Sequence, residues 1–315
     1  MRAKIIPALF TAIALTIGLT VAHAEGHKIG VLLKGQTPFW SAVEKGAVAA
    51  GQKLGVEVFV KTPPTESDVS AQILLLNALA KQGMEAIVLV PANRETLAKP
   101  AATLAAQGIK IIVVDSPLDG NSASAFIGTN HHTAGEAAGE LLKTLVTEND
   151  QISLFRHSQD NAATNSREAG AVEKLREAYP KIVVYSDVFA GNEKALQVER
   201  AQLLLAKHPA TRAVLASSTP ATMAMLEVLS HRQPLGEIKL IGFGYNLNEE
   251  VAAALEAGTL HGWVAQQPKE IGYKGVETAV DLLNGRTVPA VVNIEVFIVT
   301  KANLHEPKSQ ALLKL

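Results

Sequence analysis

Residues 29–54 read IGVLLKGQTPFWSAVEKGAVAAGQKL, a short apolar run followed by a longer amphipathic stretch, and this unit recurs along the chain. Continuous runs rich in Val, Ile and Leu predict parallel strands that are covered on both faces. Glycines follow several helical stretches, at Gly55, Gly83, Gly108, Gly258 and Gly285, where a left-handed residue typically ends a helix. The strict alternation of strand and helix predicts a doubly wound α/β architecture.

The order of these units divides the chain into two halves. Strands are predicted at 29–33, 56–60, 86–90, 110–114, 125–127, 152–155, 182–186, 213–216, 238–242 and 262–265. Helices are predicted at 39–54, 68–82, 94–107, 133–146, 166–179, 193–207, 221–231, 247–257 and 269–283. A loop with Pro117 and Gly120 interrupts the series, and a second run of units begins near His131. We therefore expect two α/β lobes of similar size rather than one ten-stranded sheet.

The first 24 residues have the layout of a cleavable secretory signal. Arg2 and Lys4 precede an apolar run from Ile5 to Val21, and Ala22-His23-Ala24 places small residues where a signal peptidase cleaves. The alternative is an uncleaved membrane anchor, because the apolar run is nearly long enough to span a bilayer. With no cysteine in the chain, disulfides and a lipid on an N-terminal cysteine are excluded. We therefore expect a soluble protein in the periplasm, cleaved near Ala24.

Charge argues against polymeric anionic partners. The formal net charge is -1, and no basic excess is available to neutralise a nucleic-acid backbone. Nucleic acid and anionic membrane surfaces are therefore not expected partners.

Residues that follow the predicted strands are the candidate ligand contacts, because ligands of open parallel sheets bind beyond the carboxyl ends of the strands. Phe39 and Trp40 are adjacent at a helix start, and an aromatic face packs well on the C–H side of a sugar. Asp115 ends a strand and could accept two hydroxyl hydrogen bonds. The alternatives are that one ring belongs to the core and that Asp115 caps a turn.

The second half offers a similar set. Arg156 follows a strand and could donate to ligand hydroxyls, or it could form a surface ion pair. Asn165 and Ser218 lie at predicted helix starts, where capping is the alternative role. Gly242-Phe243-Gly244 is no dinucleotide fingerprint, since the third glycine is missing and the strand before it is late in the chain.

No motif predicts catalysis, a cofactor or a metal. His132 and Glu136 are one helical turn apart, but the sequence shows no third ligand beside them or beside His131. A nucleophile elbow, a phosphate-binding loop and a zinc-protease motif are all missing from the sequence. The expectation is a protein that is not an enzyme.

The chain resembles periplasmic binding proteins of the ribose-binding type, which serve ABC importers. The resemblance covers essentially the whole mature chain through the order and spacing of several short motifs. They are Ile29-Gly30-Val31, Pro38-Phe39-Trp40, Gly46-Ala47, Val88-Leu89-Val90-Pro91, Val113-Val114-Asp115, Ile127-Gly128-Thr129-Asn130, Ile241-Gly242-Phe243 and the stretch from Gln266 to Val276.

This resemblance implies two lobes joined by three hinge crossings, near residues 128–130, 264–266 and 292–294, with the ligand enclosed between them. The N-terminal lobe would comprise 25–128 and 266–292, and the C-terminal lobe 129–265 and 293–315. The ligand contacts implied are Thr37, Phe39, Trp40 and Asp115 on one side, and Arg156, Asn165, Ser218, Phe243 and Gln266 on the other side and hinge.

Departures from the ribose-binding pattern keep the ligand open. They occur at Thr37, Ser116, Asn165, Ser218 and Gly244, where the pattern has Asn, Arg, Arg, Asn and Asp. Ribose itself is therefore not carried over.

The function implied by the resemblance is that of a substrate-binding component of an ABC importer. It would take up a small neutral sugar or polyol, act without a cofactor, be a monomer, and deliver the ligand to a membrane permease. A sensory receptor of the same fold is the main alternative. The effector domain of a sugar-responsive repressor and an exported hydrolase are less consistent with the export signal and with the missing nucleophile motifs.

Overall fold

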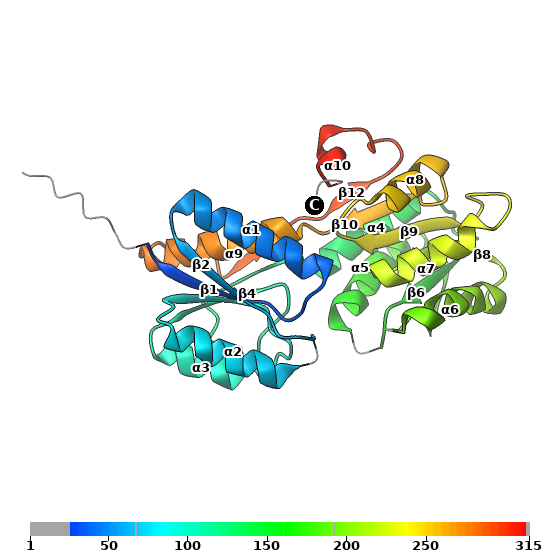
Figure 1. Cartoon of the computed structure of the whole chain (residues 1–315). Coiled ribbons are helices and arrows are strands. Elements are labelled where there is room, and N and C mark those ends of the chain that lie inside the picture. Colours follow the sequence, from blue (N-terminus) through cyan, green and yellow to red (C-terminus); the bar gives the residue numbers. More distant parts are fainter. Residues whose placement is uncertain (1–25, 67, 160, 192, 313–315) are drawn as a thin grey trace, which may run out of the picture.

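The structure is a computed structural model that describes residues 26–312 apart from 67, 160 and 192. The described residues form two lobes, each built on a six-stranded sheet with helices on both faces (Figure 1). The predicted α/β architecture of two doubly wound lobes is therefore confirmed.

The first sheet is entirely parallel and has the strand order β11-β5-β4-β3-β1-β2. Its strands are β1 (Lys28–Leu32), β2 (Glu57–Lys61), β3 (Ala86–Leu89), β4 (Lys110–Val114), β5 (Ala125–Gly128) and β11 (Val291–Asn293). Helices α1 (Pro38–Leu54) and α9 (Pro268–Leu283) cover one face, and α2 (Val69–Lys81) and α3 (Ala98–Ala106) cover the other.

The second sheet has the order β12-β10-β9-β8-β6-β7, and only its edge strand β12 runs antiparallel, to β10. Its strands are β6 (Gln151–Arg156), β7 (Val183–Phe189), β8 (Thr211–Ala216), β9 (Lys239–Gly244), β10 (Gly262–Ala265) and β12 (Phe297–Val299). Helices α4 (His131–Lys143) and α5 (Ala162–Ala178) cover one face. The other face carries α6 (Lys194–Lys207), α7 (Thr219–Ser230) and α8 (Glu249–Ala257), and α10 (Pro307–Ala311) follows β12.

The central strand β3 shows why the apolar runs are continuous. Ala86 and Val88 contribute to the core under α1 and α9, whereas Ile87 and Leu89 contribute to the core under α2 and α3. Successive side chains of a strand point to opposite faces, so a strand buried on both faces needs apolar residues at every position.

Three crossings connect the two sheets within the described chain, as the resemblance implied. They run from β5 to α4, from β10 to α9 and from β11 to β12. The first and third are hydrogen-bonded to each other, since the Ile294 amide donates to the Gly128 carbonyl oxygen at 2.8 Å. The second and third are linked by Gln267, whose side-chain amide donates to the Glu295 carbonyl oxygen at 2.6 Å. The exact lobe boundaries stay a prediction.

Two helix pairs pack so closely that their contact points require glycine. A Cβ added at Gly46 of α1 would lie 1.9 Å from the Lys269 carbonyl oxygen of α9. A Cβ added at Gly135 of α4 would lie 2.0 Å from the Arg167 carbonyl oxygen of α5. The second contact fixes the distance between α4 and the first turns of α5, near Arg167.

Some predicted element bounds were wrong. Helix α5 begins at Ala162 rather than Ser166, because the Asn161 side chain caps it by accepting from the Thr164 amide. Asn165 therefore lies inside the helix and is not its cap. Helix α3 begins at Ala98 rather than Arg94, because the Asn93 side chain closes a separate turn first. The sequence also missed β11, β12 and α10, which have three to five residues each.

The predicted helix ends at glycine are confirmed. Gly55 and Gly258 have φ of 70° and 76° at the ends of α1 and α8, a region that favours glycine over residues with a Cβ.

The predicted signal segment 1–24 lies outside the described residues. Within the described residues, no helix combines the length and apolar character needed to span a membrane.

Candidate functional site

The candidate site lies at the carboxyl ends of the strands, where loops from the two sheets approach each other. Phe39 at the start of α1 contacts Tyr245, which directly follows β9, with ring centroids 5.3 Å apart and the rings nearly perpendicular. An aromatic edge-to-face contact therefore spans the two lobes.

Asp115 directly follows β4 and is held in an unusual backbone conformation. Its φ of 62° makes it the only non-glycine residue with positive φ in the described part of the chain. The Ser116 hydroxyl donates to Asp115 Oδ2 at 2.9 Å. Lys34, which follows β1, donates to the Ser116 hydroxyl at 2.7 Å, and its Nζ lies 4.0 Å from Asp115 Oδ2. Left-handed conformations of non-glycine residues store strain and occur preferentially at functional positions, so the geometry supports a functional role for Asp115.

The two aromatic residues have different environments. Trp40 is only 4% exposed and belongs to the apolar core of the first lobe. Its Nε1 donates to Glu66 Oε1 at 2.7 Å, and Lys34 Nζ lies 5.0 Å from its ring centroid. Phe39 is half-buried and packs edge-to-face on Trp40 with centroids 4.8 Å apart. One ring therefore serves the core, as the alternative interpretation held, and the other faces the opposite lobe.

Arg156 at the end of β6 has its polar groups occupied by protein partners. Its Nε donates to Glu168 Oε2 at 2.6 Å, and its Nη2 donates to Asn165 Oδ1 at 2.9 Å. Its guanidinium also lies over the Phe189 ring at 4.8 Å. Asn165 in turn donates to the Gln159 carbonyl oxygen at 2.7 Å. The ion-pair alternative for Arg156 is thus realised, although the pair is largely buried rather than on the surface.

A second arginine, Arg167 of α5, lies deeper in the same region. It is 6% exposed, and its guanidinium lies over the ring of Phe243 at 5.0 Å. Nε and Nη2 both donate to His131 Nδ1, at 3.3 and 3.2 Å, and Nη1 donates to the Ser217 carbonyl oxygen at 3.0 Å. Phe243 itself is fully buried beneath this arginine.

Burial and charge set the protonation of this pair. Burial and the positive charges of Arg167 and Lys34 lower the pKa of His131 to about 4, and the charge of Asp115 opposes the lowering. Burial lowers the pKa of Arg167 to about 10, with the charges of Asp115 and Glu168 opposing it. At neutral pH the imidazole is therefore neutral and can accept from the arginine, which stays charged.

The remaining predicted contacts lie at the ends of β8 and β10 and near the start of α1. Ser218 caps α7 by accepting from the Ala221 amide, as the alternative interpretation held, and its hydroxyl lies 3.3 Å from His157 Nδ1. Gln266 is buried in the second crossing. Thr37 lines a pocket of about 390 Å³. The other lining residues are Gln36, Pro38, Ser41, Ala42 and Lys45 of the same lobe and Tyr245 and Asn246 of the other lobe.

The structure adds residues that the sequence analysis missed as contacts. Lys34 follows a strand in the same way as Asp115 and Arg156, so the rule used for those residues also applies to it. Tyr245 directly follows β9, so the same rule applies to it, whereas Arg167 carried no comparable signal. Thr129, in the first crossing, has a buried hydroxyl oxygen with no hydrogen-bond partner among the described residues.

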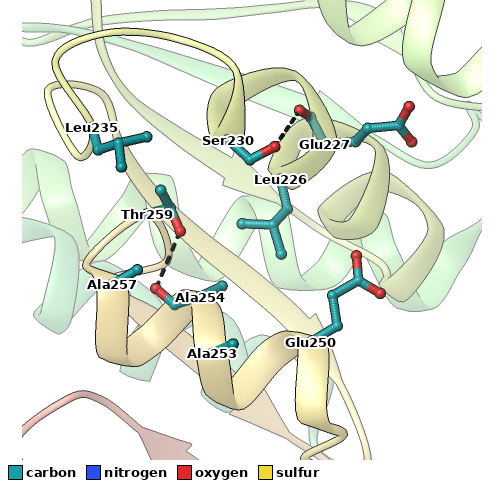
Figure 2. Close-up of a pocket in the computed structure, with 9 residues that line it drawn as sticks. All are labelled: Leu226, Glu227, Ser230, Leu235, Glu250, Ala253, Ala254, Ala257 and Thr259. Atoms are coloured by element: carbon teal, nitrogen blue, oxygen red, sulfur yellow. Dashed lines mark hydrogen bonds between the residues drawn. The ribbon is translucent and has the colours of Figure 1, made fainter.

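Another pocket lies away from this region. It has a volume of about 360 Å³ and is formed between α7 and α8 of the second lobe, with Leu226, Ala254 and Thr259 in its wall (Figure 2). It contains none of the predicted contacts.

His132 has two carboxylate neighbours: its Nε2 lies 3.1 Å from Glu173 Oε2, and its Nδ1 lies 3.8 Å from Glu136 Oε1. No three potential metal ligands of the described chain are grouped as a metal site requires.

The chain is similar to known proteins in both sequence and fold. Residues 29–287 match the family described as periplasmic binding protein domain. The chain is 26% identical to the D-allose-binding periplasmic protein of Escherichia coli K12, over 86% of this chain and 89% of that protein. It is 23% identical to the ribose import binding protein of Bacillus subtilis 168, over 88% and 85% of the two chains.

Among solved structures, a carbohydrate transporter solute-binding protein from Agrobacterium radiobacter, in complex with D-arabinose, is similar. It is 25% identical, the match covers 92% of this chain and 99% of that one, and the TM-score is 0.78.

Proposed function

The chain belongs to the periplasmic binding protein family, and on this premise we propose that it captures a small neutral sugar or polyol between its lobes for an ABC importer. The relatives support the ligand class, since proteins similar over most of the chain are described as binding D-allose, importing ribose or holding D-arabinose. The observation that carries the proposal is the convergence of polar and aromatic side chains from both sheets at the carboxyl ends of their strands.

Capture would work by lobe closure about the three crossings. A ligand that contacts both lobes binds the closed state better than the open state, and this difference in affinity shifts the population toward closure. Phe39 and Tyr245 already make contact between the lobes, so the loops that carry them are near enough to enclose a small molecule.

Selectivity would come from buried polar groups. Asp115 would accept hydroxyl hydrogen bonds, and Thr37, Ser218 and Gln266 would complete the polar set beside the ring of Phe39. The buried rings of Trp40 and Phe243, and Asn165, which is bound to Arg156, would support the site rather than contact the ligand. A ligand without the matching hydroxyl leaves a buried group unpaired, at a cost of about 1–3 kcal/mol.

The cellular setting belongs to the same proposal. The secretory segment would be cleaved near Ala24, the mature monomer would act in the periplasm without enzymatic turnover, and a membrane permease would receive the ligand. The relatives described as importing ribose or as transporter components favour transport over the sensory alternative.

The test is titration calorimetry of the mature protein against pentoses, hexoses and polyols, with Asp115→Asn as the key variant. Asparagine tolerates positive φ, so this change removes the charge without new backbone strain. We expect an affinity loss of about 10- to 100-fold, because charge-assisted hydrogen bonds are lost. Asp119→Ala, which removes a surface partner of Arg94, is the control and should bind normally. Equal affinity of wild type and Asp115→Asn would refute the site, and no binding by the wild type would refute the function.

A further inference from the structure

We propose that the pocket between α7 and α8 binds a small organic cation, an ammonium compound with an apolar body. The apolar body would pack against Leu226 and Ala254, and the ammonium group would lie toward the end of the pocket that carries Glu227 and Glu250 (Figure 2). This pocket is separate from the site proposed for the sugar, so the inference goes beyond the proposed function and can be tested without a sugar.

The pocket has the size and the apolar base of a small-molecule site. Its volume of about 360 Å³ falls in the range of roughly 300–1,000 Å³ in which small-molecule sites are found. Leu226 of α7 and Ala254 of α8 are buried beneath it, and Leu235, which is 46% exposed, lies at the opposite end from the two glutamates (Figure 2). An apolar ligand body would remove this apolar surface from water, which favours binding.

The hydroxyl groups that line the pocket are already used as donors. The Ser230 hydroxyl donates to the Glu227 carbonyl oxygen at 2.8 Å, and the Thr259 hydroxyl donates to the Ala254 carbonyl oxygen at 3.2 Å (Figure 2). The remaining polar side chains of the pocket, Glu227 and Glu250, only accept hydrogen bonds when they are ionised. A polar group of the ligand must therefore be a donor, and an ammonium group has only donors.

The charge of the pocket also favours a cation. Among the described residues, no lysine, arginine or histidine nitrogen lies within 4.0 Å of the carboxylate of Glu227 or Glu250. Glu250 lies in the first turn of α8, where the helix dipole favours a carboxylate. Glu227 lies in the last turn of α7, where the dipole disfavours a carboxylate, and no basic residue lies in that turn. A bound ammonium group would offset both the unpaired carboxylate and the negative end of α7.

Other occupants fit these features less well. The two carboxylates would repel an anion, and a neutral apolar compound would leave both of them unpaired. A stable protein partner would bury about 800 Å² on this side of the interface. Within the described chain, however, Leu235 is the only large hydrophobic side chain of this pocket that is exposed. The small apolar area therefore favours a small cation over a protein.

The experiment uses three probes of similar shape and different charge: phenethylammonium, phenethyl alcohol and hydrocinnamate. Binding to the mature protein is followed by backbone amide chemical shifts in NMR spectra, which also locate the site. We expect phenethylammonium to bind with a Kd of about 1 mM or tighter and to shift the resonances of α7 and α8. The alcohol should bind about 5-fold more weakly, because exposed ion pairs add only modest affinity, and hydrocinnamate should not bind detectably.

Substitutions test the two parts of the pocket. Glu227→Gln and Glu250→Gln each remove one charge, so each should weaken phenethylammonium binding by about 2- to 5-fold and leave binding of the alcohol unchanged. Glu249→Gln is the matched control, because Glu249 lies in the same turn of α8 but does not line the pocket, and it should bind as wild type. Ala253→Leu fills the pocket from an exposed position and should abolish binding of both probes, with circular dichroism as the check on the fold.

Four results would overturn the inference. They are equal affinity for phenethylammonium and the alcohol, undiminished binding in Ala253→Leu, equal losses in Glu249→Gln and Glu250→Gln, and no binding by the wild type at about 10 mM probe. None of them bears on sugar capture, which calorimetry with sugars tests separately, so the proposed function would stand.

Discussion

Substituting Gly135 by alanine tests the link between helix packing and the candidate site. The new Cβ would lie 2.0 Å from the Arg167 carbonyl oxygen, whereas ordinary contacts begin near 3.4 Å, so α4 and α5 must separate by about 1.4 Å. Overpacking typically costs ~1–3 kcal/mol. The cost here should lie at the upper end of that range, because the added Cβ meets backbone atoms of Arg167 and not a flexible side chain. Alanine recovers ~1 kcal/mol of helix propensity.

The expected net loss is about 2 kcal/mol of unfolding free energy, or ~4–8 °C in Tm. Because the shift occurs at the start of α5, where Asn165 and Arg167 lie beside the candidate site, affinity for the bound sugar should fall by about 10-fold, the loss expected for one weakened hydrogen bond. Thermal unfolding and calorimetry measure the two effects.

Gly275→Ala in α9 is the matched control, because it brings the same gain in helix propensity to the first lobe. Its Cβ would lie 2.9 and 3.2 Å from side-chain methyl groups of Val88 and Val114, which can adjust more readily than a backbone carbonyl. This variant should lose under about 1 kcal/mol and bind normally. If Gly135→Ala matched wild type in both Tm and affinity, the close α4–α5 contact and its role in placing Arg167 would be refuted.

Three further predictions concern single buried groups. The pKa of His131, lowered to about 4, means that the unfolded state takes up the proton first on acidification. Unfolding free energy should therefore fall between about pH 6.5 and 4 by at most ~3 kcal/mol, and His131→Asn should flatten this slope in urea titrations. Gly244→Ala places a Cβ 1.8 Å from the buried Trp263 ring and should lower stability by about 2–3 kcal/mol, with Trp263→Phe restoring part of it in thermal unfolding. Thr129→Val removes a buried hydroxyl that has no hydrogen-bond partner among the described residues. In the absence of sugar, the free energy of unfolding measured by urea titration should therefore rise by up to ~1 kcal/mol. A lower free energy of unfolding would show that the hydroxyl has a partner.

The sequence was sufficient for the architecture because its signals are local. Apolar runs such as residues 110–114 identify strands buried on both faces, and glycines such as Gly55 end helices through a positive φ that other residues resist. Asp115 could be singled out for the same reason: it follows a strand, and strand ends of parallel sheets converge. The start of α5 was mispredicted because several consecutive residues can cap a helix, and only the folded chain shows that Asn161 does so.

The composition of the candidate site depended on contacts between segments far apart in the chain. Sequence patterns gave no sign that Arg167 would be buried over Phe243 and bound by His131, because a charged residue in a helix is usually solvated. The contact between the rings of Phe39 and Tyr245 was likewise not predictable, because the two residues come from different lobes. Local pattern thus determined the longer strands and helices and the residues at the strand ends, but not the short elements β11, β12 and α10. Tertiary packing decided which of those residues are already paired and which are left to meet a ligand, since burial and partners depend on how the two sheets approach each other.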